Sequence, residues 1–299
     1  MGYIEERAGL PGKVAAVVGG ATGVGAAVTL ALAKAGVDVA FCDINADGVA
    51  ATRGEVERLG RRVVASVTDA LDAEQLRQFY DAIDLEFDRL DILVNVVGGV
   101  HFGEFAEALP EQWADDIHRN FGWTLLSMNL AIPRIRAGGR GGSIINFTTI
   151  EAHRGAAGLA AYAGAKAGLA NFSRALGVEL ARERIRVNLI APDTTPSETS
   201  TNAMDQEVWQ LLGSAPRQTR RGAFAVYVPM GVPPRAEELG DAVLFLASDL
   251  SSSITGTTIH VDGGTWASAG FARWPSPFGW MPIPPATLFR DDAFDDPSA

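Results

Sequence analysis

The sequence predicts an α/β protein built around a doubly wound parallel sheet of about seven strands, with helices on both faces. Short runs rich in apolar and β-branched residues alternate along the chain with longer stretches of helical periodicity. The short runs are almost continuously apolar, as strands are when helices cover both faces of a parallel sheet. Ligands of such a sheet bind at the carboxyl ends of its strands, so functional residues are expected there.

Seven segments match this strand pattern. In chain order they are residues 14–18, 38–43, 62–67, 91–97, 142–147, 185–190 and 258–264. Apolar residues recur at helical spacing in the intervals 26–35, 72–87, 111–135 and 160–182. No break in composition interrupts this alternation, and we therefore expect residues 1–264 to form one domain around a single sheet.

The composition changes after residue 264. Residues 265–299 contain six of the 15 prolines and three of the six tryptophans of the chain. Proline at this density prevents regular structure, whereas Trp266, Trp274 and Phe278 are too apolar to favour solvent. We therefore expect a tail that packs on its own or a neighbouring subunit, with a disordered tail as the alternative.

The charge balance argues against nucleic-acid and membrane partners. The chain carries 25 basic and 36 acidic residues, a net charge of −11, and no basic run is longer than two residues. Its N-terminus lacks the apolar core of a secretory signal, and no window approaches about 18 uninterrupted apolar residues. Cys42 is the single cysteine, so no internal disulfide can form. These features predict a cytoplasmic protein whose partners are small molecules or copies of itself.

A glycine-rich segment follows the first expected strand and predicts a dinucleotide site. In "GGATGVG" (19–25), Gly19, Gly23 and Gly25 permit a tight turn, and the following helix offers free N–H groups to a pyrophosphate. The second strand ends in Asp43, where a carboxylate can accept both ribose hydroxyls and repel a 2′-phosphate. No Lys or Arg follows within "INADGVA", so NAD is favoured over NADP. A helix cap or turn is the alternative role of Asp43.

A second segment, "AAYAGAKAG" (160–168), places a phenol and an ammonium one helical turn apart. Tyr162 and Lys166 share one face of a helix and can act on the same point in space. Lys166 is one of three lysines beside 22 arginines, which indicates that the amine has a specific task. A cation close to a phenol favours the phenolate and lowers its pKa, more so beside an oxidised nicotinamide. The pair therefore predicts a phenol tuned by the neighbouring amine; a buried ring with a lysine reaching solvent is the alternative.

Together these motifs resemble the short-chain dehydrogenase/reductase family, in its single-domain branch, over roughly residues 12–264. The glycine motif of the family is similar to "VGGATGVG", with Val18 in place of Thr, and its closing strand to "VDGG" (261–264). Its Asn-Asn-Ala-Gly is similar to the run from Asn95 to Gly98, and its Tyr-x-x-x-Lys to the pair described above. The resemblance implies a Rossmann fold, a nicotinamide dinucleotide and, commonly, a tetramer formed through the helices near 111–136 and 160–182.

The resemblance also implies which residues form the site. Tyr162, Lys166, Thr149 and Asn120 match the catalytic set, and Asn120, on a locally opened helix, is expected to support a water that links Lys166 to solvent. Asp69 matches the acid that meets the adenine amino group. The full set expected to bind the cofactor is Gly19, Thr22, Gly23, Val24, Gly25, Asp43, Ile44, Asp69, Ala70, Asn95, Val96, Gly98, Tyr162, Lys166, Pro192, Thr194 and Thr195.

Two positions depart from the family pattern. Thr149 stands where the family has its serine, so the hydroxyl is kept and a methyl group is added. We prefer Thr149 to Thr148 because alternate strand residues face opposite sides. Asp193 replaces a glycine in "APDTTP", and this leaves open whether Thr194 or Thr195 contacts the nicotinamide carboxamide.

The substrate pocket is expected on loops at strand ends. His101, Glu151 and His153 occupy such loops and are candidates to recognise a polar substrate atom, with local hydrogen bonding as the alternative role. Their spacing does not match a metal site, so no metal is expected. Residues 193–234 are long enough to form a lid, which suits a largely apolar or cyclic substrate, although its apolar side chains have equal reason to pack the lid itself. These side chains are Trp209, Leu211, Leu212, Phe224, Val226 and Tyr227.

The function predicted from these residues is that of an NAD-dependent oxidoreductase that interconverts a secondary alcohol and a ketone. A catalytically weak dinucleotide-binding sensor on the same fold is the alternative, because Thr149 and Asp193 depart from the family pattern. A sugar-nucleotide epimerase or dehydratase is disfavoured, because such enzymes carry a larger substrate domain than the Pro-rich tail can supply.

Overall fold

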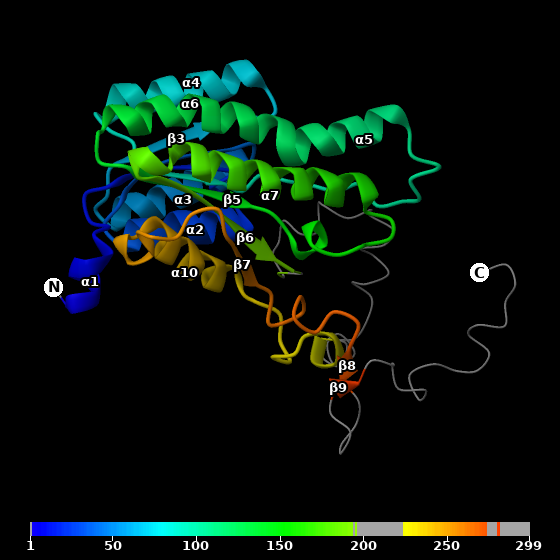
Figure 1. Cartoon of the computed structure of the whole chain (residues 1–299). Helices are drawn as coiled ribbons and strands as arrows, with labels where there is room; N and C mark the ends of the chain where they lie inside the picture. The colour runs from blue at the N-terminus through cyan, green and yellow to red at the C-terminus, as the bar shows by residue number, and fades with distance from the viewer. Residues whose placement is uncertain (1, 194, 196–223, 274–279, 282–299) are drawn as a thin grey trace, which may run out of the picture.

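The computed structural model describes residues 2–193, 195, 224–273 and 280–281, and its centre is a seven-stranded parallel sheet (Figure 1). The sheet has the order β3-β2-β1-β4-β5-β6-β7. Its strands are β1 (Val14–Val18), β2 (Asp38–Asp43), β3 (Val63–Val67), β4 (Ile92–Asn95), β5 (Gly142–Phe147), β6 (Ile185–Pro192) and β7 (Thr258–Val261). The expected fold class and strand number are confirmed, and strand ends differ from the expected bounds by at most three residues.

Helices cover both faces of this sheet (Figure 1). On one face lie α4 (Ala73–Glu86), α6 (Trp123–Ala137) and α7 (Ala160–Leu180), with α5 (Pro110–Ile117) preceding α6. On the other face lie α2 (Gly23–Lys34), α3 (Ala46–Arg58) and α10 (Ala236–Ala247). A short helix, α1 (Tyr3–Ala8), precedes β1. The bounds of α3 were not expected because it buries only Val49, Thr52 and Val56, too few to give a clear apolar period.

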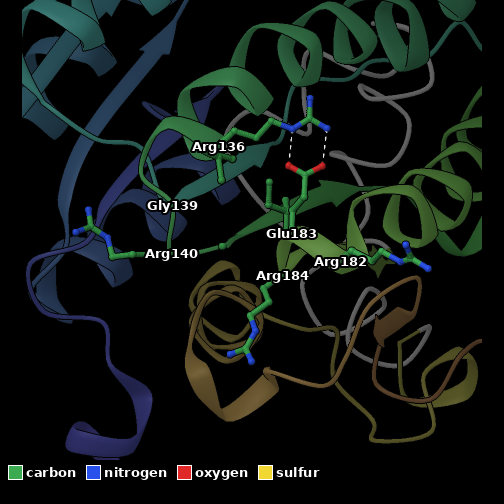
Figure 2. A pocket seen from close by; sticks show the side chains of 9 residues that line it. Arg136, Gly139, Arg140, Arg182, Glu183 and Arg184 are labelled. Carbon is green, nitrogen blue, oxygen red and sulfur yellow. Dashed lines mark hydrogen bonds and ion pairs between the residues drawn. The ribbon is translucent and has the colours of Figure 1, made fainter.

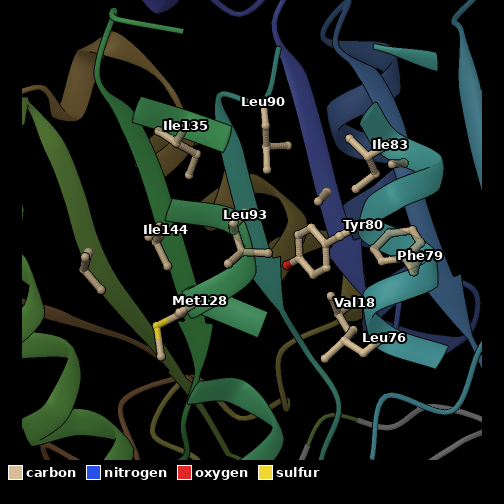
Figure 3. Close-up of a cluster of buried hydrophobic side chains, with 14 of the residues drawn as sticks. Val18, Leu76, Phe79, Tyr80, Ile83, Leu90, Leu93, Met128, Ile135 and Ile144 are labelled. Atoms are coloured by element: carbon tan, nitrogen blue, oxygen red, sulfur yellow. The ribbon is translucent and has the colours of Figure 1, made fainter. Parts of the chain in front are cut away.

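Two apolar clusters fill the space between the sheet and the helices. Figure 3 shows the cluster under α4 and α6, where Tyr80 of α4 approaches Leu93 of β4 and Phe79 packs against Tyr80. The second cluster joins α2 and α10 to the opposite face, with Leu32 and Leu239 fully buried. Full burial of a side chain of this size is worth about 1.5–3 kcal/mol, so both helix layers are held by many such contacts.

The expected helix 111–135 is divided in the structure. Residues His118–Gly122 form a π-helical turn between α5 and α6. The side-chain amide of Asn120 donates a hydrogen bond to the carbonyl oxygen of Asp116 at 2.9 Å. In an α-helix this carbonyl would accept the backbone N–H of Asn120, so the side chain takes over an acceptor of the helix ladder. The turn moves Asn120 out of register and directs it towards the carboxyl end of β4.

A layer of buried polar side chains lies beneath the carboxyl ends of the central strands. Ser127 donates to Asn95 Oδ1 at 2.7 Å, and Asn95 Nδ2 donates to Asn146 Oδ1 at 2.8 Å. Asn146 Nδ2 in turn donates to Ser173 Oγ on α7 at 3.0 Å. Because these groups are buried, each broken link would leave an unsatisfied polar atom. The layer fixes α6 and α7 against β4 and β5.

The expected lid and tail fall largely outside the described residues. Of the lid, Trp209, Leu211 and Leu212 lie outside them, whereas residues 224–227 form one helical turn. Of the tail, Trp274 and Phe278 lie outside, and a short antiparallel pair joins β8 (Ala272–Arg273) to β9 (Trp280–Met281). Over the described part of the chain, no helix has the length and apolar character needed to span a bilayer.

Candidate functional site

The glycine-rich turn between β1 and α2 is shaped by close backbone contacts. Gly19 has a φ of +84°, and a Cβ atom there would lie 2.7 Å from Val97 Cγ2. A Cβ atom at Gly25 would lie 1.7 Å from the carbonyl oxygen of Gly19. Only glycine permits this approach of the helix to the turn. Thr22 is the N-cap of α2, and Gly23 and Val24 open the helix, so the N–H groups of the first turn face the carboxyl edge of the sheet.

Asp43 ends β2 beside this turn. Its carboxylate accepts hydrogen bonds from Ala21 N and Asn45 N, both at 3.1 Å. Asn45, not Asp43, caps α3, since Asn45 Oδ1 accepts from Gly48 N. The next residue, Ile44, is 71% exposed. An oriented carboxylate and an apolar side chain therefore stand together next to the glycine turn.

Two further cofactor candidates lie at neighbouring strand ends. Asp69 follows β3 and its carboxylate accepts from Leu71 N at 2.9 Å, while Ala70 is buried. After β4, Val96 N donates to Val18 O at 3.0 Å. The side chain of Asn95 belongs to the buried polar layer, so only its backbone remains for a ligand.

Lys166 and Asn120 meet at Gly98. A Cβ atom at Gly98 would lie 3.0 Å from Asn120 Oδ1 and 3.3 Å from Lys166 Nζ. Asn120 also donates to Gly99 O at 2.7 Å. Lys166 is 4% exposed, and its ammonium donates to the carbonyl oxygen of Phe147 at 3.0 Å. An amide and an amine are thus brought together at the ends of β4 and β5.

Tyr162 and Thr149 form the other half of this group. Thr149 follows β5, and its hydroxyl is close enough to the Tyr162 phenol to influence the pKa of that group. Thr148, the alternative, instead donates to the carbonyl oxygen of Lys166 at 3.2 Å. The structure therefore brings Thr149 to the phenol and uses Thr148 to tie the strand end to α7.

The pKa of Tyr162 differs from the expectation. The sequence predicts that Lys166 lowers it, but burial of the hydroxyl raises the pKa of Tyr162 to about 12. The Thr149 hydroxyl opposes this rise, and the charges of Glu151 and Asp116 add to it. Burial also lowers the pKa of Lys166 to about 8. Loss of hydration therefore dominates both groups in the protein alone, and the lowering of the Tyr162 pKa beside an oxidised nicotinamide stays a prediction.

Glu151 lies beside this group. The Thr149 hydroxyl donates a short hydrogen bond to Glu151 Oε2, and Arg154 Nη2 lies 2.8 Å from Glu151 Oε1. Arg154 also donates to the Tyr227 hydroxyl at 2.7 Å. A continuous chain of hydrogen bonds therefore runs from Thr149 to the helical turn at 224–227.

The other two substrate-pocket candidates have different surroundings. His101 Nδ1 lies 2.9 Å from a carboxylate oxygen of the buried Asp116, in a cavity of about 200 Å³ between the loop after β4 and the N-terminus of α7. His153 packs against His260 of β7, with ring centroids 4.9 Å apart, and Trp266 stacks on His260 at 5.4 Å. Of these three candidates, His101 lines this cavity, whereas Glu151 and His153 do not.

The loop after β6 is described only in part. Pro192 ends the strand, and Thr195 Oγ1 donates to Asp193 O at 3.3 Å. Thr194 lies outside the described residues. The choice between the two threonines remains a prediction.

A larger cavity, of about 570 Å³, lies at the opposite edge of the sheet, at the amino ends of β5 and β6 (Figure 2). Arg136 and Glu183 face each other there through two hydrogen bonds of 2.5 and 2.7 Å. The side chains of Arg140, Arg182 and Arg184 point away from one another in Figure 2. The size of this cavity therefore does not make it a site, since its cations do not converge.

Two residues near the site were missed by sequence reasoning. Arg154 stands three residues after Glu151, and this spacing of opposite charges was the available signal. His260 gave no signal, because it reaches His153 only through the pairing of β7 with β6. Within the described ranges, no three His, Cys, Asp or Glu side chains gather as a metal ion would require.

Known proteins resemble the chain over most of its length. A family model described as enoyl-(acyl carrier protein) reductase matches residues 19–265. A 3-oxoacyl-(acyl-carrier-protein) reductase FabG of Chlamydia trachomatis is 32% identical over 256 residues, which are 85% of this chain and 98% of that protein. A sorbitol dehydrogenase of Cereibacter sphaeroides is 31% identical over 259 residues, which are 87% of this chain and 99% of that protein.

Two solved structures share the fold. Carveol dehydrogenase from Mycobacterium avium, in complex with NAD, has a TM-score of 0.80 and 28% identity, over 86% of this chain and 98% of that chain. Levodione reductase has a TM-score of 0.78 and 25% identity, also over 86% of this chain and 98% of that chain. The family match takes in β2 to β7 and ends at residue 265, so nearly all of the tail lies beyond it.

Substitution of Gly25 tests the shape of the turn. In Gly25→Ala, the added methyl collides with the Gly19 carbonyl, so we expect loss of dinucleotide binding and a lower free energy of unfolding. Gly54→Ala is the control, because nothing lies within 4 Å of a Cβ at that position on α3, and it should gain about 0.5–1 kcal/mol. Calorimetric titration with NAD and urea unfolding measure both effects; unchanged NAD affinity in Gly25→Ala would contradict the assignment of the turn.

The histidine pair should make stability depend on pH. Burial lowers the pKa of His153, with the charges of His260 and Arg174 adding, and burial lowers the pKa of His260 against the opposing charge of Asp262. The unfolded chain then binds more protons than the folded chain below the usual value of 6.5, so the free energy of unfolding falls as the pH drops.

Urea unfolding at about pH 8 and about pH 5 measures this loss in the wild type and in His260→Gln. The variant should lose less stability than the wild type between the two pH values. His118→Gln, which changes an exposed histidine, is the control and should match the wild type. An identical loss in all three proteins would rule out the pair as its source.

Proposed function

The chain belongs to the short-chain dehydrogenase/reductase family of oxidoreductases, which bind nicotinamide dinucleotides, and we propose that it is an NAD-dependent enzyme interconverting a secondary alcohol and a ketone. One observation carries the proposal. Thr149 lies at the Tyr162 phenol, Lys166 and Asn120 lie at Gly98, and both pairs are at the carboxyl ends of β4 and β5. A phenol, a hydroxyl and a buried amine at the same edge of the sheet are suited to proton transfer.

The residues at the strand ends fit a dinucleotide. Gly19, Thr22, Gly23, Val24 and Gly25 would hold the pyrophosphate, because the close packing of Gly25 on the Gly19 carbonyl sets this turn directly against the N-terminus of α2. Asp69 and Ala70 would meet the adenine, and Asn95, Val96 and Gly98 would line the path to the nicotinamide. Pro192 and Thr195 would lie at the nicotinamide end, with Thr194 as the second candidate there.

Asp43 supports NAD rather than NADP. Its carboxylate is fixed by two backbone N–H groups beside the turn, where it would accept ribose hydroxyls, and Ile44 would flank the adenosine. A negative charge at this point repels a 2′-phosphate, and no Lys or Arg follows before Arg53. The similar carveol dehydrogenase was solved with NAD, which agrees with this preference.

Separate residues of this chain would carry out the other steps of alcohol oxidation. A bound oxidised nicotinamide supplies the hydride acceptor. Tyr162 takes the hydroxyl proton, and Thr149 holds the substrate oxygen by a hydrogen bond. Lys166 binds the nicotinamide ribose and, with the charge of the nicotinamide, brings the phenol towards its ionised form. Asn120 keeps Lys166 in contact with a path for protons to solvent.

The substrate is proposed to be largely apolar or cyclic. Carveol and levodione, after which two similar structures are named, are cyclic molecules, whereas sorbitol is an open polyol. Tyr227 is bonded to Arg154 beside Glu151, and Phe224, Val226 and Tyr227, in the same helical turn, would supply apolar surface to such a ring.

A dinucleotide-binding sensor is the second candidate. One observation favours it: the proton of Thr149 is already donated to Glu151, so the hydroxyl is not free to hold a substrate. A sensor would bind NAD tightly and turn over no alcohol.

We further propose that the protein is cytoplasmic and forms a homotetramer through α5, α6 and α7, as in the family. Trp113 and Ile117 on α5 and Val178 on α7 are exposed apolar side chains, 37%, 43% and 78% exposed, that such contacts would cover. Light scattering in solution should give four times the mass of one chain, and Val178→Glu should lower it. A monomeric mass for the wild type would contradict the assembly.

Tyr162→Phe tests the enzymatic role. The variant keeps the ring and loses only the proton acceptor. We therefore expect turnover to fall by about 10²–10⁴-fold while the affinity for NAD is retained. NADH absorbance with a panel of cyclic, aromatic and sugar alcohols measures turnover, and calorimetry measures binding of NAD and NADP. Tyr3→Phe, in the exposed helix α1, is the control.

The outcomes separate the candidates. Loss of NAD binding together with turnover would mean that Tyr162 is structural. Tight NAD binding by the wild type without turnover of any alcohol would favour the sensor, and stronger use of NADP would overturn the role of Asp43.

A further inference from the structure

The hydroxyl of Thr149 has one proton, and that proton is committed within the protein. Thr149 Oγ1 donates it to Glu151 Oε2, and Glu151 N approaches the same hydroxyl at 3.4 Å. A threonine hydroxyl can donate only one hydrogen bond at a time. To hold the oxygen of an alcohol or ketone, as the proposed function requires, Thr149 must therefore release Glu151.

Releasing Glu151 is unfavourable unless another donor takes the place of Thr149. The side chain of Glu151 is only 14% exposed, and a carboxylate oxygen without a donor in such a position loses a charge-assisted hydrogen bond. Glu151 cannot readily swing out to water, because Arg154 holds Oε1 at 2.8 Å and is itself bonded to Tyr227 at 2.7 Å. The side chain of Arg154 is 25% exposed, so this anchor is also half-buried.

We propose that Glu151 is a specificity-determining residue that accepts a hydrogen bond from a second hydroxyl of the substrate, adjacent to the reacting carbon. This inference rests on the proposed function and narrows its substrate class to vicinal diols and α-hydroxy ketones. The second hydroxyl replaces Thr149 at Glu151 Oε2, and the freed Thr149 hydroxyl donates to the reacting oxygen. A substrate without the second hydroxyl leaves Thr149 on Glu151 and binds poorly.

The geometry sets the spacing of the two substrate oxygens. Thr149 Oγ1 and Glu151 Oε2 are in direct hydrogen-bond contact. Neighbouring oxygens of a gauche diol lie about 3 Å apart, which is also the length of a hydrogen bond, so one oxygen can meet each protein group. Oxygens on more distant carbons would not match two groups in direct contact.

The charges favour a hydroxyl over an ammonium as the second donor. Glu151 is already paired with Arg154, so the pair as a whole carries no net charge. A cationic amine placed at Glu151 would lie close to the Arg154 guanidinium and be repelled by it. A neutral hydroxyl gains the hydrogen bond without that repulsion.

The chemistry of the diol balances without further reactants. The C–H bond at the reacting carbon breaks and its electron pair leaves with the hydride to oxidised NAD, while the proton of the same carbon's hydroxyl passes to Tyr162. The product is an α-hydroxy ketone. The second hydroxyl keeps its proton and serves only as a donor to Glu151.

Glu151→Gln should abolish the preference for the diol. The amide oxygen of Gln is expected to face Arg154, which places its NH₂ group towards Thr149. The amide then donates to Thr149 rather than accepting from it, so the hydroxyl is free without a diol, and the diol loses its acceptor. Glu183→Gln is the matched control, since Glu183 forms a similar pair with Arg136 at the far edge of the sheet.

The experiment compares kcat/KM for cis-1,2-cyclohexanediol and cyclohexanol with NAD, measured from NADH absorbance. We expect the wild type and Glu183→Gln to prefer the diol by at least about tenfold, and Glu151→Gln to bring the ratio close to one with a higher rate on cyclohexanol. An unchanged ratio in Glu151→Gln, or no preference in the wild type, would overturn the inference while leaving the proposed function intact.

Calorimetric titration of both alcohols into protein saturated with NADH distinguishes failure of this inference from failure of the proposed function. Failure of the proposed function would appear as no turnover of any alcohol, whatever the variant. In that case tighter binding of the diol to the wild type than to Glu151→Gln would still support Glu151 as a diol site, and equal binding would overturn it. 2-Aminocyclohexanol is the third ligand, and a preference for it over the diol would contradict the charge argument.

Discussion

A buried ammonium group is the constraint on which the site depends. Lys166 is 4% exposed and donates to the carbonyl oxygen of Phe147 at the end of β5. A charged amine without acceptors would be costly at this depth, and burial already lowers the pKa of Lys166 to about 8. The helix must therefore keep this face against the strand end, and Thr148 strengthens the contact through its bond to the carbonyl of Lys166. Tyr162, one turn earlier, is placed at Thr149 as a consequence.

The fold supplies the rest of the arrangement through buried polar contacts. The link from Ser127 through Asn95 and Asn146 to Ser173 holds α6 and α7 on β4 and β5 beneath the site. The π-helical turn releases Asn120 from the helix ladder and brings it to Gly98 beside the amine. Buried polar side chains of the core thus fix the positions of the side chains proposed to act in catalysis.

Patterns that act locally along the chain could be predicted from the sequence. The apolar strands, the glycine turn and the Tyr-Lys spacing each depend on neighbouring residues, and the seven strands agree with their expected bounds within three residues. Features that depend on contacts across the sheet could not be predicted. His260 meets His153 through the pairing of β6 and β7, and Arg154 joins Glu151 to Tyr227 far along the chain. The raised pKa of Tyr162 in the protein without nucleotide could not be predicted, because its main cause is burial, which a sequence does not display.

The most direct test of this interpretation is the ionisation of Tyr162, followed by the ultraviolet difference absorbance of phenolate. The spectrum of the wild type minus that of Tyr162→Phe isolates one phenol. Without nucleotide we predict a pKa of about 12 for this group, and a lower pKa when oxidised NAD is bound, because the nicotinamide adds a positive charge beside Lys166. A pKa that stays the same when NAD saturates the protein would contradict the role of Tyr162 as the proton acceptor.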